Sequence, residues 1–148
     1  DETAAISQAV MRIIQTILGM DAEIASEHYN GENSETMLFC RLTYQSEHRT
    51  LVRAYVGMEV RLILAAVSEM MGMRVHKLDK ISLAAVAQIS KSIMKNLSEQ
   101  FAYADPCRLE KENLISYEIM MKTLQNHYPS ISLLFRMQAG YLVFCLQV

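Results

Sequence analysis

The chain has 148 residues and a mass of 16.9 kDa, the size of one domain with a substantial core. A formal charge of −2 and a pI near 6.1 supply no basic field for nucleic acid or an anionic membrane. No run approaches the roughly 18 consecutive apolar residues of a membrane span. We therefore expect a single domain over residues 1–148, with no nucleic-acid partner and no membrane span.

The first half predicts a helix followed by a β-hairpin. Residues 3–19 place apolar side chains on one helical face and stop at Gly19. Residues 21–35 are polar and read as a loop with room for a short strand, in which Asn30–Gly31 indicates a turn. Residues 36–45 and 49–56 are rich in β-branched and aromatic residues, and the short link between them predicts two antiparallel strands.

Two helices are expected next. Residues 58–73 change to helical spacing and close at Gly72, and residues 76–101 contain neither Gly nor Pro over about seven helical turns. The long helix divides into an apolar arc and a polar arc. The expected buried side chains are Leu83, Ala85, Val86, Ile89, Ile93, Met94, Leu97 and Phe101. The expected outward side chains are Lys77, Lys80, Gln88, Lys91, Ser92, Lys95 and Ser98, an arrangement that is also typical of an ordinary solvated helix surface.

The C-terminal part is expected to be β-structure. Residues 102–107 break regularity at Asp105–Pro106, residues 114–121 read as a strand and residues 122–129 as a polar connection. Residues 131–138 and 141–148 flank Ala139–Gly140 and predict a closing hairpin. The element order is then α-β-β-α-α-β-β-β, which favours an α+β fold with an antiparallel sheet packed by long helices.

The residues that commonly carry chemistry form no recognised motif. Cys40, Cys107 and Cys145 are widely spaced, so we expect buried structural thiols in a reducing cytoplasm. The histidines are scattered and the glycines form no phosphate-binding loop, so neither a metal site nor a cofactor is expected. The methionines are expected to fill gaps in the core, with a partner-binding groove as the alternative. They include Met70, Met71, Met73, Met120 and Met121.

Residues 58–98 resemble a known protein family. The segments AAVSEMMG at 65–72, Leu78–Asp79 and SLAAVAQISK at 82–91, with the order of elements, resemble the CheC/CheX/FliY family of bacterial chemotaxis phosphatases, and CheX-like members in particular. The resemblance implies helices packed on an antiparallel sheet, a homodimer formed through sheet edges, and dephosphorylation of the response regulator CheY. In that family a Glu-x-x-Asn motif on the long helix acts on the partner: the asparagine positions the attacking water and the glutamate pairs with a lysine of the regulator.

This chain departs from the motif at both key residues. The matching positions are Gln88 and Lys91, our candidate catalytic residues, while Ala84, Ser92 and Lys95 are expected to contribute to partner binding. Glutamine keeps a hydrogen-bonding amide without the charge, whereas a lysine ammonium has no acceptor atom. Literal Glu-x-x-Asn strings occur at 27–30 and 110–113, in expected loops, and we interpret them as chance matches. The family's proline has only Pro106 as a counterpart, closer to the motif.

Three functional hypotheses remain open. The first is a CheX-like, cytoplasmic, homodimeric domain that binds a response-regulator receiver in chemotaxis or two-component signalling, with lost or weakened phosphatase activity. The second is an active aspartyl-phosphate phosphatase in which Gln88 positions the water and Lys91 steadies the phosphoryl oxygens. The third is a non-enzymatic interaction or sensory module that binds another protein through its helix face or sheet edge.

Overall fold

The computed structural model describes residues 2–100 and 107–148, apart from the side chain of Cys107. The described helices are α1 (Glu2–Leu18), α2 (Val60–Met71), α3 (Lys80–Gln100) and α4 (Tyr117–Asn126). The described strands are β1 (Glu23–Ser26), β2 (Met37–Ser46), β3 (Leu51–Glu59), β4 (Cys107–Ile115), β5 (Ile131–Met137) and β6 (Gly140–Gln147). A short 3-10 turn, Ser34–Thr36, precedes β2.

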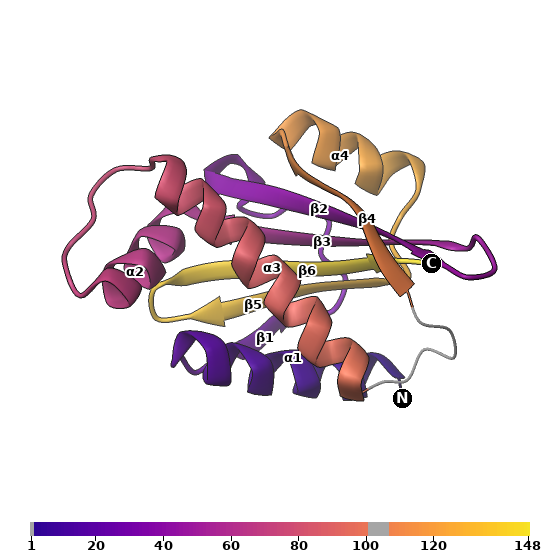
Figure 1. Ribbon diagram of the computed structural model, residues 1–148, viewed down its shortest axis with the longest axis horizontal. Helices are drawn as coiled ribbons and strands as arrows, with labels where there is room; N and C mark the ends of the chain where they lie inside the picture. The colour runs from indigo at the N-terminus through magenta and orange to yellow at the C-terminus, as the bar shows by residue number, and fades with distance from the viewer. Residues whose placement is uncertain (1, 101–106) are drawn as a thin grey trace.

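The strands form one antiparallel sheet in the order β1-β5-β6-β3-β2-β4. Two hairpins supply its centre, β2–β3 and β5–β6, and β6 pairs with β3 to join them. β4 returns from the far end of α3 to pair with β2, so it forms one edge of the described sheet (Figure 1). The short β1 forms the other edge beside β5.

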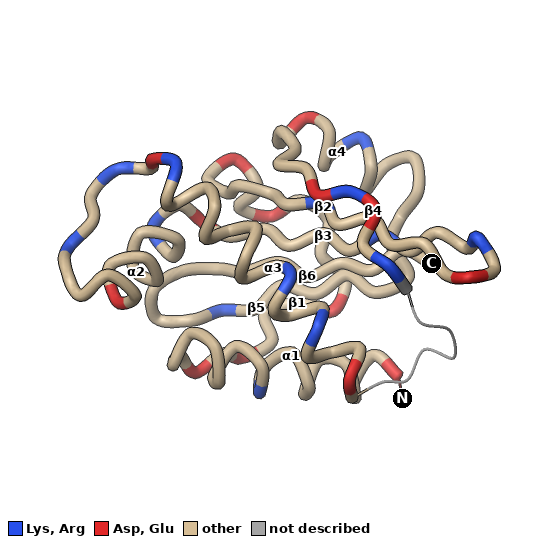
Figure 2. The backbone as a smooth tube through the Cα atoms, viewed as in Figure 1, with Lys and Arg blue, Asp and Glu red and all other residues tan. Residues whose placement is uncertain are grey.

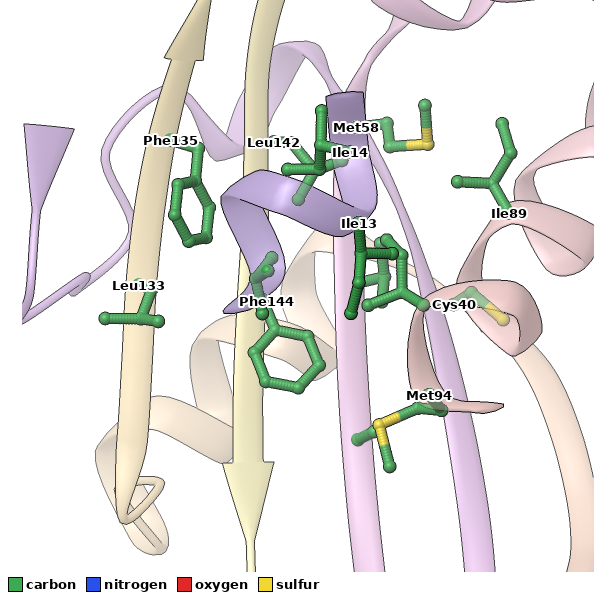
Figure 3. Packing of buried hydrophobic residues seen from close by; sticks show 14 of the residues in the cluster. Ile13, Ile14, Cys40, Met58, Ile89, Met94, Leu133, Phe135, Leu142 and Phe144 are labelled. Carbon is green, nitrogen blue, oxygen red and sulfur yellow. The ribbon is translucent and has the colours of Figure 1, made fainter. Parts of the chain in front are cut away.

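The helices cover the two faces of the sheet unequally. α1, α2 and α3 pack on one face, where their apolar side chains join those of the central strands in the larger core cluster (Figure 1). Figure 3 shows Ile13 and Ile14 of α1 above Phe144, with Ile89 and Met94 of α3 further along the same face. α4 lies on the opposite face and contributes Met120 and Leu124 to a smaller cluster. The face opposite α3 is therefore only partly covered by apolar contacts.

The predicted fold class is confirmed, and the expected elements occur in the expected order with β1 and α4 in addition. The two expected hairpins form, and α2 ends at Gly72, whose φ of 65° is left-handed. The short strand allowed for between residues 21 and 35 is β1. Residues 101–106, which include Phe101, Asp105 and Pro106, lie outside the described residues.

The bounds predicted between residues 114 and 129 are partly wrong: the strand is confirmed only at residues 114–115, and the connection only at residues 127–129. Residues 107–115 form β4, and residues 117–126 form α4 instead of a strand and a polar connection. Ser116 caps this helix by accepting a hydrogen bond from the backbone N–H of Ile119 at 3.2 Å. The second Glu-x-x-Asn string, at 110–113, consequently lies on a strand, while the first, at 27–30, lies outside the regular elements apart from an isolated bridge at His28.

The predicted burial of side chains needs smaller corrections. Met120 is buried as expected, whereas Met70, Met71 and Met73 are exposed because they lie where α2 ends and its connection to α3 begins. Leu83 is also exposed, since it lies at the margin of the apolar arc near the start of α3. Cys40 and Cys145 are buried free thiols, as predicted.

No helix within residues 2–100 and 107–148 has the length and hydropathy needed to cross a membrane. Among the same residues, no group of three or more His, Cys, Asp or Glu side chains is arranged to hold a metal ion.

Candidate functional site

Helix α3 is positioned by a capped start and a buried stripe. Asp79 precedes its first turn, and its Oδ1 accepts hydrogen bonds from the backbone N–H of Ser82 at 2.9 Å and from its hydroxyl at 3.0 Å. Those bonds hold the pKa of the Asp79 carboxyl below its usual value, with the backbone bond from Ser82 the largest cause. Residues along one side of the helix are buried against α1, α2 and the sheet. They are Ser82, Ala85, Val86, Ile89, Ser90, Ile93, Met94 and Leu97.

The predicted site residues lie together on the outer side of this helix. Ala84, Gln88, Lys91, Ser92 and Lys95 follow one another at intervals of three or four residues, apart from the adjacent pair 91–92, and we call this set the α3 ridge. Figure 2 shows basic segments along this helix. The structure thus brings all five predicted residues onto one surface, with none buried.

Gln88 and Lys91 differ in how free their side chains are. Gln88 is exposed, and its side chain makes no hydrogen bond with a described residue. Lys91 is half-buried, and its Nζ lies 3.3 Å from Glu112 Oε1 on β4. The amide of Gln88 is therefore available to a partner, while the ammonium of Lys91 already has an acidic neighbour.

The other members of the α3 ridge are less engaged. Ala84 and Lys95 are exposed. Ser92 is half-buried, and its backbone carbonyl accepts a hydrogen bond from Asn96 Nδ2 at 2.7 Å. This bond fixes the Asn96 amide along the helix, whereas the amide of Gln88 on the α3 ridge makes no hydrogen bond with a described residue.

A small pocket opens between the α3 ridge and β4. Its volume is about 240 Å³, and Leu83, Ala84, Ala87 and Leu114 give it a largely apolar wall beside Glu112 and Asn113. Cys40 also lines it. Burial raises the pKa of the Cys40 thiol, with an opposing contribution from its hydrogen bond to Ser90, so the thiol stays protonated and is not an activated nucleophile.

Sequence reasoning missed one residue of this surface. Strand pairing of β4 with β2 brings Glu112 beside Lys91, 21 positions away in the sequence. No local motif signals this contact, because it depends on the pairing of two distant segments. The surface therefore combines an amide, an ammonium and a carboxylate from two elements, a set that can bind and orient polar groups without a protein nucleophile.

Comparison with models of known protein families finds no match, and neither does a search of curated proteins. Solved structures do match. CheX from Vibrio vulnificus is 13% identical with a TM-score of 0.69, over 99% of this chain and 97% of that one. CheX from Borrelia burgdorferi, solved as a complex with CheY, BeF3 and Mg, is 13% identical with a TM-score of 0.64, over 100% and 99%. FliY from Thermotoga maritima is 13% identical with a TM-score of 0.58, over 99% and 86%.

These likenesses extend over nearly the whole of this chain. At such low identity they report the arrangement of helices and strands, and they agree with the resemblance carried by residues 58–98. The chain has the fold of the CheC/CheX/FliY chemotaxis proteins.

Proposed function

We propose that this chain is a CheX-like domain that binds a response-regulator receiver through the α3 ridge, in chemotaxis or two-component signalling. The observation that carries the proposal is the exposure of Gln88, together with Ala84 and Lys95, on a fold whose relative from Borrelia burgdorferi was solved in complex with CheY. A receiver partner also implies a cytoplasmic location.

The chemistry of the α3 ridge suits binding. The apolar pocket wall at Leu83, Ala84 and Ala87 offers contact area beside the polar side chains, as interface cores require. Lys95 adds an exposed cation, which favours an acidic, phosphorylated partner. Both kinds of interaction act on one side of α3.

Phosphatase activity is expected to be lost or weakened. Water attack on an aspartyl phosphate needs a group that accepts a hydrogen bond from the water, and the asparagine carbonyl does this in the family motif. Lys91 occupies that position with three N–H donors and no acceptor. Its ammonium is also paired with Glu112, so it should bind phosphoryl oxygens more weakly than a free ammonium would.

A binding assay tests the proposal. We would mix the purified chain with receivers from the same genome, with and without acetyl phosphate, and measure complex formation by isothermal titration calorimetry. Ala84→Glu should abolish the complex by placing a carboxylate against an acidic partner. Ala5→Glu is the matched control, because Ala5 is an exposed alanine on α1, and it should leave binding unchanged. Failure of every receiver to bind would defeat the proposal.

An active phosphatase is the second candidate, favoured by the exposure of the Gln88 amide. A glutamine carbonyl can accept a hydrogen bond from water while its N–H group donates to the phosphoryl oxygens. The assay is the decay of phosphorylated receiver with wild-type protein and with Gln88→Ala. Unchanged decay in Gln88→Ala, at a rate above the spontaneous one, would remove Gln88 from catalysis.

A non-enzymatic interaction module is the third candidate. It is favoured by Met70, Met71 and Met73, which are exposed in one short segment near the end of α2, because exposed methionines form adaptable binding surfaces. Binding of a non-receiver protein that Met70→Ser weakens and Ala84→Glu does not would support this candidate over the first two.

We also propose that the domain is a homodimer formed through β4. This strand ends the described sheet, residues 108–114 are exposed, and nine residues give it enough length to pair with a second copy. β1 at the opposite edge has four residues and a register shift, which suits it less. Light scattering should give the mass of a dimer, and Leu109→Lys should shift it toward the monomer. A monomeric wild-type protein at all concentrations would contradict this.

A further inference from the structure

The face of the sheet opposite α3 carries a cleft, lined mainly by polar and charged residues, that the receiver-binding proposal does not use. It lies beneath α4 and over β2, β3 and β4, and its volume is about 620 Å³. That size falls within the usual range of small-molecule sites. The smaller apolar cluster lies on the same face of the sheet. Charged side chains of this face line the cleft beside that cluster.

Four cationic side chains line this cleft: Arg41, Arg53, Lys111 and Lys122. They come from β2, β3, β4 and α4, so the sequence gives no sign of their convergence. None of them makes an ion pair or a side-chain hydrogen bond with another residue of the described ranges. Figure 2 shows basic segments on β4 and α4 at this end of the sheet.

Strand register places the cations as neighbours. Thr43 lies opposite Arg53 on one side and opposite Lys111 on the other, which makes a row across three strands. Arg41 lies opposite Tyr55 in the next row, so the two arginines are diagonal neighbours on one face, roughly 7–8 Å apart and somewhat less between their Cβ atoms. Two arginine side chains that start this close together can bind one extended anion together.

The acid in the cleft does not neutralise this charge. Glu110 is the acidic residue among those that line it, and its Oε1 accepts hydrogen bonds from Nε and Nη2 of Arg108 at 3.1 and 3.0 Å. At the floor, the Tyr55 hydroxyl donates to Gln147 Oε1 at 3.0 Å, so these two groups satisfy each other rather than the cations. The cleft is therefore an uncompensated positive site in a chain with a net charge of −2.

Protection of an edge strand does not account for the cluster. Lysines on edge strands discourage unwanted strand pairing, and this would explain Lys111 on β4. Arg41 and Arg53 lie on β2 and β3 in the interior of the sheet, where they are half-buried and where such protection has no use. Half-buried arginines without acidic partners leave a positive charge on this face that a bound anion would neutralise.

We propose that this cleft binds a small molecule that carries a polyphosphate and is of nucleotide size. The two arginines bind phosphate oxygens through paired N–H donors, with Lys111 and Lys122 as further point charges. Leu51 and Ile119, both exposed at the cleft wall, offer apolar contact to the uncharged part of the ligand. This site is independent of the α3 ridge, because it lies on the other face of the sheet.

Calorimetric titration of the full chain with the sodium salts of ATP and pyrophosphate tests the proposal. Saturable binding of ATP is expected, with no binding of adenosine. Arg41→Gln and Arg53→Gln should each weaken it roughly tenfold to a hundredfold, the usual effect of removing a hydrogen bond to a charged group. Arg12→Gln is the matched control, because Arg12 is an exposed arginine on α1, and it should leave the affinity unchanged.

Two further measurements keep the test decisive if a variant folds poorly. Arg41→Lys keeps the charge and should weaken ATP less than Arg41→Gln does. In the wild-type protein, ATP should shift the backbone amide resonances of β2, β3 and β4 and leave those of α1 unchanged. The proposal is overturned if neither ATP nor pyrophosphate binds, if Arg12→Gln weakens ATP as much as Arg41→Gln, or if citrate binds as tightly as ATP.

Discussion

Lys91 Nζ on α3 lies 3.3 Å from Glu112 Oε1 on β4, so the predicted motif position is tied to the edge of the sheet. The side chains are 30% and 44% exposed, which limits the contribution of this pair to stability to below about 1 kcal/mol. If the proposed receiver binding holds, the pair should matter more for binding than for stability, because the carboxylate would compete with a phosphoryl group for the same ammonium.

Glu112→Gln should strengthen binding of a phosphorylated receiver by about twofold to fivefold, because it frees the ammonium of Lys91 and removes a negative charge from the surface. The free energy of unfolding should change by less than about 1 kcal/mol. Titration calorimetry and urea denaturation measure the two effects. Glu118→Gln, which removes an exposed acid from α4, is the control and should leave the affinity as it is.

Installing the family motif should create or raise phosphatase activity. In the double variant Gln88→Glu/Lys91→Asn, the asparagine supplies the missing acceptor for water and the glutamate supplies the charge for the regulator's lysine. We expect phosphorylated receiver to decay at least roughly tenfold faster than with wild-type protein, the low end of what a positioned group contributes. Gln88→Glu alone should give little of this gain. If the double variant binds the receiver and decay is unchanged, the positions 88 and 91 do not match the motif.

The sequence predicts the central architecture because its signals there are local. α3 has an uninterrupted apolar stripe, and α2 ends at a glycine in the left-handed region. β4 has no such signal: residues 108–114 are exposed at the sheet edge, so its side chains show no alternation, and backbone pairing with β2 creates the strand. α4 buries only Met120 and Leu124, which makes its helical period too weak to outweigh the β-branched and aromatic residues nearby.

The candidate site was predictable only in part for the same reason. The α3 ridge follows from helical periodicity, so its outward side chains could be read from the sequence. Glu112 and the apolar pocket wall depend on long-range pairing of β4 with β2 and could not. The cationic cleft likewise depends on register across three strands, such as Thr43 between Arg53 and Lys111.

Substitution of a buried methionine should lower the free energy of unfolding far more than substitution of an exposed one. Met58 is fully buried on β3, and Met58→Ala should lower the free energy of unfolding by about 2–5 kcal/mol through lost contacts and a cavity. Met70 is 65% exposed, and Met70→Ala should change it by less than about 0.5 kcal/mol. Urea denaturation measures both variants. A similar loss in the two would contradict the burial of Met58 on β3 and the exposure of Met70 on α2.

Gly57 should tolerate no side chain, because it lies directly opposite Phe39 across β2 and β3. A Cβ atom at Gly57 would lie 2.5 Å from Phe39 Cε1 and 2.7 Å from Cδ1 of a fully buried ring. Gly57→Ala should therefore lower the free energy of unfolding by about 1–3 kcal/mol. Gly57→Ala should cost less free energy of unfolding in a Phe39→Leu background than in the wild-type protein, because the smaller leucine relieves the clash. Urea denaturation of the wild type, the two single variants and the double variant measures this difference. Strictly additive losses would exclude the clash.

The cap at Asp79 should make the start of α3 sensitive to pH. The carboxylate accepts two hydrogen bonds from Ser82, which hold its pKa in the folded state below the usual 3.8. A lowered folded pKa gives stability that is fully present above pH 3.8 and is lost as the pH falls through the folded value.

Asp79→Ala should therefore lower the melting temperature by about a few degrees at pH 7, and the difference from wild type should shrink below pH 3.8 as the wild-type carboxyl is protonated. Differential scanning calorimetry between pH 3 and pH 7 measures both curves. Asp21→Ala, which changes an exposed aspartate outside the helices, should show no such convergence. A difference that stays constant across this range would mean that Ser82 does not bind the ionised carboxylate and that α3 begins without this cap.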